Sequence, residues 1–145
     1  MMNNYEQNMR QSEINKILTK MAEILDISTT QYEDAVSKYK AMANYLGQDP
    51  NIGFYSPELY PQGSFGLGTM VKPITDKDEF DIDLVCELKF GNTKLFSQEH
   101  LKDLIGDRLK SGIYKSMLKN MEGGRRCWTI EYAEKTQLHL DILPA

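Results

Sequence analysis

The sequence predicts an α/β domain in which long N-terminal helices pack against a mixed β-sheet. Three observations indicate this fold class: two helical apolar periodicities in the first third of the chain, an alternating strand near residue 82, and two alternating segments near residue 140. The elements follow the order helix, helix, strand, helix, strand, strand. A chain of 145 residues can bury one proper core and is short for two.

Residues 1–50 are expected to be helical. The first helix carries apolar residues at the spacing of one helix face: Ile14, Ile17, Leu18, Met21, Ile24 and Leu25. After a break, Ser28 with Gln31, or Thr30 with Glu33, can form a capping box for a second helix. The second helix is expected to end at Gly47, and a loop then leads to the rest of the chain.

Residues 51–145 are expected to contain the sheet. A strand at 80–88 buries alternate residues, namely Ile82, Leu84, Cys86 and Leu88. Ser97 can cap the helix that follows, whose apolar residues are Leu101, Leu104, Ile105 and Leu109. Two further strands are predicted at 127–132 and 137–143, next to each other in the sheet.

The composition limits the classes of function. A formal net charge of −4 argues against strong non-specific binding to nucleic acid, which usually requires a basic face. The two cysteines, Cys86 and Cys127, have no recognisable metal-binding spacing. No apolar run approaches the length of a membrane span and nothing resembles a signal peptide, so we expect a cytoplasmic protein with reduced thiols.

A glycine-rich loop at 61–69, Pro-Gln-Gly-Ser-Phe-Gly-Leu-Gly-Thr, is the first functional signal. Gly63 allows the backbone to approach a phosphate closely, and the hydroxyl of Ser64 can donate a hydrogen bond to it. A helix beginning just after Ser64 would add free backbone N–H groups. Thr69 can support the turn, and Lys72 is the nearest fixed positive charge. Alone, such a loop is more often a turn without a ligand.

Two carboxylates, Asp81 and Asp83, follow this loop one residue apart in the predicted strand. Because strand side chains alternate, both point to one face, where their like charges repel. A hard divalent cation resolves this repulsion, since it takes oxygen ligands. Asp141, near the centre of the last apolar strand, would complete the site. Solvated carboxylates on an exposed sheet face are the alternative interpretation.

The loop and the three acids together predict metal-assisted nucleotidyl transfer. Two Mg²⁺ or Mn²⁺ ions would bind: one lowers the pKa of an attacking hydroxyl, and the other stabilises the leaving pyrophosphate. His139 shares the face of Asp141 by alternation and could assist the site, but a structural histidine is the preferred interpretation. Glu79, at the start of the strand, is interpreted as solvated.

These residues resemble the DNA polymerase β-like nucleotidyltransferase superfamily, whose pattern is Gly-Ser, then Asp-x-Asp, then a third Asp. Within it, the chain is similar to the bacterial cGAS/DncV-like nucleotidyltransferases (CD-NTases) from about Tyr60 onward. The segments that carry the resemblance are 62–65, 68–69, 72–73, 79–85 and 140–145. The extended Gln-Gly-Ser-Phe form is considerably more specific than Gly-Ser alone.

The resemblance implies a polymerase β-like nucleotidyltransferase fold, with residues 1–50 as a helical spine and residues 51–145 as the catalytic core. It implies that the ligands of Mg²⁺ are Asp81, Asp83 and Asp141. The nucleotide-binding residues that it implies are Gln62, Gly63, Ser64, Phe65, Thr69 and Lys72.

Members of this family make cyclic di- or trinucleotide messengers from nucleoside triphosphates in anti-phage defence. The resemblance therefore implies that ATP, GTP or pyrimidine nucleotides are joined and cyclised with release of pyrophosphate. One alternative is a relative that acts on RNA, a protein or a small molecule. Another is a non-catalytic nucleotide-binding or antitoxin-like module.

Enzymes of this family carry a sizeable C-terminal helical part that completes the nucleotide pocket, whereas this chain stops four residues after Asp141. We therefore expect an N-terminal catalytic-core fragment; the alternative is a naturally short relative. An isolated core is expected to bind nucleotide and metal weakly and to fail in cyclisation. Its exposed apolar surface would favour self-association.

Overall fold

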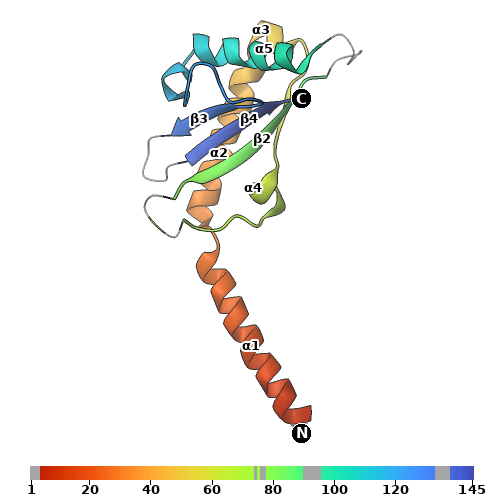
Figure 1. Ribbon diagram of the computed structural model, residues 1–145, viewed down its shortest axis with the longest axis vertical. Coiled ribbons are helices and arrows are strands. Elements are labelled where there is room, and N and C mark those ends of the chain that lie inside the picture. The colour runs from red at the N-terminus through yellow and green to blue at the C-terminus, as the bar shows by residue number, and fades with distance from the viewer. Residues whose placement is uncertain (1–3, 74, 76–77, 90–95, 133–137) are drawn as a thin grey trace.

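A computed structural model describes residues 4–73, 75, 78–89, 96–132 and 138–145 (Figure 1). The helices are α1 (Asn4–Leu25), α2 (Thr29–Gly47), α3 (Pro50–Gly53), α4 (Gly63–Leu67), α5 (Gln98–Ser111) and the 3-10 helix η2 (Lys115–Met117). The strands are β1 (Glu58–Pro61), β2 (Phe80–Glu87), β3 (Trp128–Tyr132) and β4 (Leu138–Pro144). Among the described residues, no helix combines the length and hydropathy that a membrane crossing would require.

The four strands form one mixed sheet in the order β1-β2-β4-β3. β2 and β4 run parallel, whereas β1 is antiparallel to β2 and β3 is antiparallel to β4. A parallel pair requires a crossover connection, and α5 lies in the segment that joins β2 to β4. The mixed sheet confirms the predicted α/β fold class.

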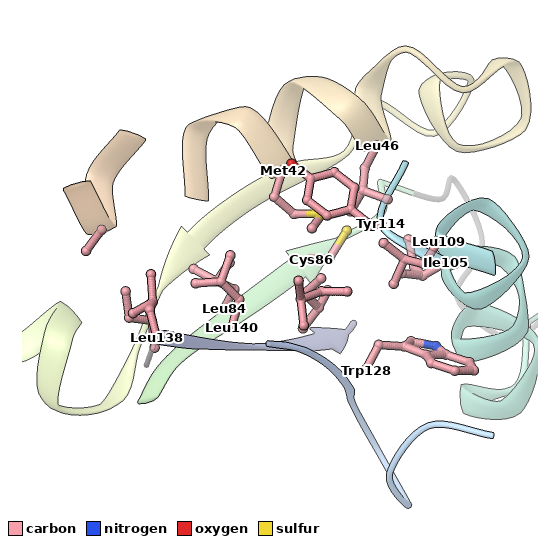
Figure 2. Close-up of a cluster of buried hydrophobic side chains, with 14 of the residues drawn as sticks. Met42, Leu46, Leu84, Cys86, Ile105, Leu109, Tyr114, Trp128, Leu138 and Leu140 are labelled. Atoms are coloured by element: carbon pink, nitrogen blue, oxygen red, sulfur yellow. The ribbon is translucent and has the colours of Figure 1, made fainter. Parts of the chain in front are cut away.

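Alternation along the strands places the hydrophobic core on one face of the sheet. Side chains from β2, β3 and β4 meet side chains from α2 and α5 there (Figure 2). The fully buried members include Met42, Leu46, Ile82, Leu84, Cys86, Ile105, Leu109, Ile130, Leu140 and Ile142. Trp128 is also buried, and its indole N–H donates to the carbonyl of Lys102 at 2.8 Å, which ties β3 to α5.

Helix α1 lies apart from this core. It extends away from the sheet in Figure 1, and none of its 22 residues is buried. The helix itself is confirmed, but the prediction that it packs against the sheet is wrong, whereas α2 packs there as predicted. Its exposed apolar residues include Met9, Ile14, Ile17, Leu18, Met21 and Ile24. Periodicity indicates which face of a helix is apolar and does not identify the surface that covers it.

The helix boundaries follow their caps, and three short elements, α3, β1 and η2, were not predicted. Ser28 and Gln31 form the capping box of α2, and Ser97 accepts a hydrogen bond at the start of α5. Helix α3 lies where a loop was expected, because Asp49 caps it and proline occupies its first turn. Strand β1 has four residues, lies at the sheet edge and ends in proline, so its pattern is weak. Residue 137, predicted to begin the last strand, lies outside the described residues.

Candidate active site

The second face of the sheet is polar, and its side chains form two rows across β3, β4 and β2. The first, the acid row, is Thr129, Asp141 and Asp83. The second, the histidine row, is Glu131, His139 and Asp81. Because β2 and β4 are parallel neighbours in this register, all three predicted aspartates meet on one face.

The carboxylate of Asp141 is held in place by a neighbouring strand. The hydroxyl of Thr129 donates to Oδ1 of Asp141 at 2.5 Å. Such a charge-assisted bond is short and strong, so it restricts rotation of the half-buried carboxylate. Sequence reasoning missed Thr129, because the register that pairs β3 with β4 cannot be read from either strand alone; the only signal was its polar side chain at an alternating position.

Gly63 brings the glycine-serine loop directly onto Asp83. Its φ is +61°, and a Cβ atom added there would collide with Oδ2 of Asp83. The backbone N–H of Gln62 also donates to the carbonyl oxygen of Asp83 at 2.9 Å. The loop backbone and the carboxylate are therefore in contact at a position where only glycine fits. The expected helix is present as α4 and begins at Gly63, one residue before Ser64.

The remaining residues of the predicted nucleotide site lie in different surroundings. Ser64 is exposed, and its carbonyl oxygen accepts from the backbone N–H of Thr69 at 2.8 Å, which closes the loop. The side chain of Phe65 is buried and stacks on Tyr32, with ring centroids 5.3 Å apart, so it anchors α4 to α2. Lys72 is half-buried beside the end of α1, and within the described residues no ion pair joins it to the three aspartates.

The electrostatics of the face suit a divalent cation. Partial burial, the largest cause, raises the pKa of the Asp81 carboxyl above its ordinary value. The positive charge of His139 opposes this rise, while the negative charges of Asp141, Glu79 and Asp83 add to it. A bound cation would relieve the same crowding of charge. Aspartate oxygens are the ligands that Mg²⁺ and Mn²⁺ prefer, so the residues present fit such ions.

Replacing Asp81 with asparagine is expected to raise the melting temperature of the metal-free protein at neutral pH. An acid whose pKa is raised by folding destabilises the fold when ionised, and this penalty is lost as the pH falls through the folded-state pKa. The gain is small, because the side chain is 68% exposed. Thermal melts in a chelator should show the variant's advantage shrinking toward pH about 4, the ordinary aspartate range. An advantage independent of pH would contradict this origin.

The imidazole of His139 lies beneath the exposed carboxylates of its row. The residue is 7% exposed, and its Nδ1 lies 3.2 Å from Oε2 of Glu79 and 3.5 Å from Oδ1 of Asp81. Its Nε2 lies 3.7 Å from Oε1 of Glu131. The ring therefore contacts a predicted metal ligand, and Glu79, although exposed, is close to the same site. Sequence alternation had placed His139 on this face without indicating these contacts.

The mixed sheet carries three carboxylates on one face beside a glycine-serine loop, the arrangement that the nucleotidyltransferase resemblance predicts. The chain belongs to the family described as cyclic GMP-AMP synthase DncV-like, nucleotidyltransferase domain, whose model matches residues 57–144. This range contains the loop and all three aspartates. The family resemblance inferred from the sequence motifs is thereby confirmed.

Two curated relatives match nearly the whole chain. It is 29% identical to a c-di-GMP synthase of Roseivirga ehrenbergii over 134 residues, which are 92% of this chain and 34% of that protein. It is 26% identical to the cyclic dinucleotide synthase CdnG of Bradyrhizobium diazoefficiens over 134 residues, which are 91% of this chain and 30% of that protein. The chain therefore spans about a third of the length of these relatives.

Solved structures agree with these matches. The CD-NTase CdnG of Bradyrhizobium diazoefficiens, determined in complex with GTP, matches with a TM-score of 0.66 and 27% identity, over 88% of this chain and 36% of that one. CdnC of Escherichia coli, in a complex with HORMA-deltaN, matches with a TM-score of 0.63 and 20% identity, over 89% of this chain and 40% of that one. At 20% identity, the match to CdnC shows similarity of fold alone. Together they confirm the polymerase β-like fold.

Proposed function

We propose that this chain is the catalytic core of an enzyme that joins nucleoside triphosphates and closes them into a cyclic dinucleotide. The observation that carries the proposal is the convergence of Asp81, Asp83, Asp141 and the Gly63 backbone on one open sheet face. A relative that is a c-di-GMP synthase and a similar structure that binds GTP support GTP as a substrate.

The three aspartates would hold two divalent ions, Mg²⁺ or Mn²⁺. When bound, such ions neutralise phosphate charge and make a hydroxyl easier to deprotonate. Asp83 would be the central ligand, because it lies beside Asp81 on its own strand and opposite Asp141 on the next. Thr129 would keep the carboxylate of Asp141 in its binding orientation.

The loop before α4 would bind the triphosphate of the donor nucleotide. The side chain of Gln62 makes no capping bond at the start of α4, so the first backbone N–H groups of this turn are not capped by it. With the exposed hydroxyl of Ser64, they can donate to phosphate oxygens. Phe65 would act by anchoring the loop, and Thr69 by closing it. Lys72 would supply positive charge to the bound nucleotide.

In the proposed reaction, a ribose hydroxyl oxygen of one nucleotide attacks the α-phosphorus of another. A new phosphorus–oxygen bond forms, the bond to pyrophosphate breaks, and the hydroxyl proton passes to solvent. A second step of the same kind closes the ring and releases a second pyrophosphate. Phosphoryl transfer requires little covalent chemistry from the protein, so positioning and charge would supply the catalysis.

We further propose that the product is a messenger in anti-phage defence, made in the cytoplasm. The family resemblance supports the role in anti-phage defence. The two cysteines, Cys86 and Cys127, form no disulfide, as expected in a reducing compartment, and this supports the cytoplasmic location. Phage challenge of cells with the wild-type gene and with an Asp83→Asn gene would test the messenger role.

The test of the reaction uses the full-length gene product. It is incubated with the four nucleoside triphosphates and Mg²⁺ or Mn²⁺, treated with phosphatase, and its products are identified by mass spectrometry beside an Asp81→Asn/Asp83→Asn control. A phosphatase-resistant cyclic dinucleotide that is absent from the control is expected. Label entering RNA, a protein or a small molecule instead would overturn cyclisation and favour another acceptor. Absence of any nucleotide transfer under these conditions would count against the proposal.

Replacing Thr129 with valine is expected to lower the rate of product formation about tenfold, the effect typical of losing a partner that orients a metal ligand. Valine has a similar shape but lacks the hydroxyl that donates to Asp141. Serine at the same position keeps the hydroxyl and should recover most of the rate. Initial rates in the product assay measure this, and equal rates for the valine and serine variants would refute the role of the hydroxyl.

A further inference from the structure

We propose that His139 is a positioning residue for Asp81 and that the histidine row thereby sets the affinity of the site for divalent metal. The inference rests on the proposed function, because it takes Asp81 as a metal ligand. It replaces the interpretation of His139 as a histidine with only a structural role.

The position of His139 is fixed by strand register. On β4 it lies beside Asp81 of β2 and beside Glu131 of β3. Each of its ring nitrogens faces a carboxylate: Nδ1 faces Glu79 and Asp81, and Nε2 faces Glu131. Because carboxylates contact the imidazole at both nitrogens, the ring has one preferred orientation.

Burial makes these contacts necessary for the protein. His139 is 7% exposed, whereas the side chains of Asp81 and Glu131 are 68% and 42% exposed. A buried polar ring needs partners for its nitrogens, since leaving them unpaired would cost free energy. Asp81, by contrast, could reach solvent in several rotamers. The contact therefore restricts the mobile carboxylate through the immobile ring.

An Asp81 that lost the contact with His139 would be free to turn away from Asp83 and Asp141. Metal ligands are generally held by such partners, and their loss weakens metal binding about 10- to 100-fold.

Mn²⁺ binding by the full-length protein without nucleotide tests the proposal, with free Mn²⁺ measured by electron paramagnetic resonance. His139→Leu keeps bulk but removes both nitrogens, and it should weaken binding at least about tenfold. His139→Asn keeps an N–H donor near the position of Nδ1 and should stay within about threefold of wild type. A purely structural histidine would not favour asparagine over leucine at a buried site.

A second variant keeps the test decisive if His139→Leu fails to fold. Glu131→Gln weakens the contact at Nε2 from a partly exposed position, and it should weaken Mn²⁺ binding about threefold with an unchanged melting temperature. Wild-type affinity in His139→Leu, or in Glu131→Gln where His139→Leu does not fold, would overturn the proposal. So would nitrogen hyperfine coupling to bound Mn²⁺ that disappears in His139→Asn, because His139 would then itself be a ligand.

Asp81→Asn separates this inference from the proposed function. If Asp81→Asn weakens Mn²⁺ binding and His139→Leu does not, the positioning role is wrong and the metal site stands. If neither variant weakens binding, the assignment of Asp81 as a metal ligand fails, and the inference fails with it.

Discussion

Replacing Asp83 with asparagine is expected to lower the rate of cyclic dinucleotide formation at least about a thousandfold, which corresponds to about 4 kcal/mol of transition-state stabilisation. Asp83 lies between the other two aspartates and the glycine-serine loop on the polar face. It lies opposite Asp141, one alternate position from Asp81, and in contact with the backbone of Gly63. Asparagine keeps the shape of the side chain and removes its negative charge, so the loss would report on charge and metal ligation.

A matched control is available on helix α5. Asp107 is an exposed aspartate there, and Asp107→Asn makes the same chemical change outside the polar face. Product formation is measured for both variants under saturating metal and nucleotide, with thermal melts to establish folding. Retention of more than about a tenth of the wild-type rate by Asp83→Asn would be incompatible with its place as central ligand.

Replacing Gly63 with alanine is expected to lower the rate about a hundredfold, because an error of about 1 Å in the position of reacting groups has an effect of this size. Two features act at this residue. Its φ of +61° is unfavourable for alanine, and the added Cβ would collide with Oδ2 of Asp83. The collision must push the loop away from the carboxylate or turn the carboxylate.

Gly68 separates the two effects. Its φ is +68°, but a Cβ added there meets nothing within 4 Å. Gly63→Ala and Gly68→Ala should therefore share a backbone strain of about 1–2 kcal/mol, visible as similar losses of stability in denaturant melts. Only Gly63→Ala should lose most of its activity. A comparable loss in Gly68→Ala would mean that loop strain, and not contact with Asp83, limits the reaction.

The parts of the molecule that follow from local patterns were predictable from the sequence. Alternation placed Ile82 and Leu84 on one face of β2 and Asp81 and Asp83 on the other, and the structure has this arrangement. Capping chemistry predicted that α2 starts at Ser28 or at Thr30, and the capping box forms at Ser28. These signals depend on residues close together in the chain, so one sequence suffices to read them.

The individual contacts that depend on the register between distant segments were not predictable. The polar side chain of Thr129 at an alternating position does not by itself indicate that it faces Asp141, because the antiparallel register of β3 and β4 is set by packing and turn geometry. The sequence favours a structural role for His139 because its carboxylate contacts come from β2 and β3, which the sequence does not pair with it residue by residue. The failure to place α1 has the same origin, because an apolar stripe does not specify its partner.

The sharing of β2 and β4 between the core and the polar face limits how this domain can change length during evolution. One strand residue contributes to the core and the next to the site, so a single deletion inside β2 would move the following aspartate into the core and a leucine into the site. Point substitutions at either face can be selected one at a time, whereas insertions and deletions within these strands destroy both functions together. Related sequences should therefore vary in length between the strands, and they should align with β2 and β4 without insertions or deletions.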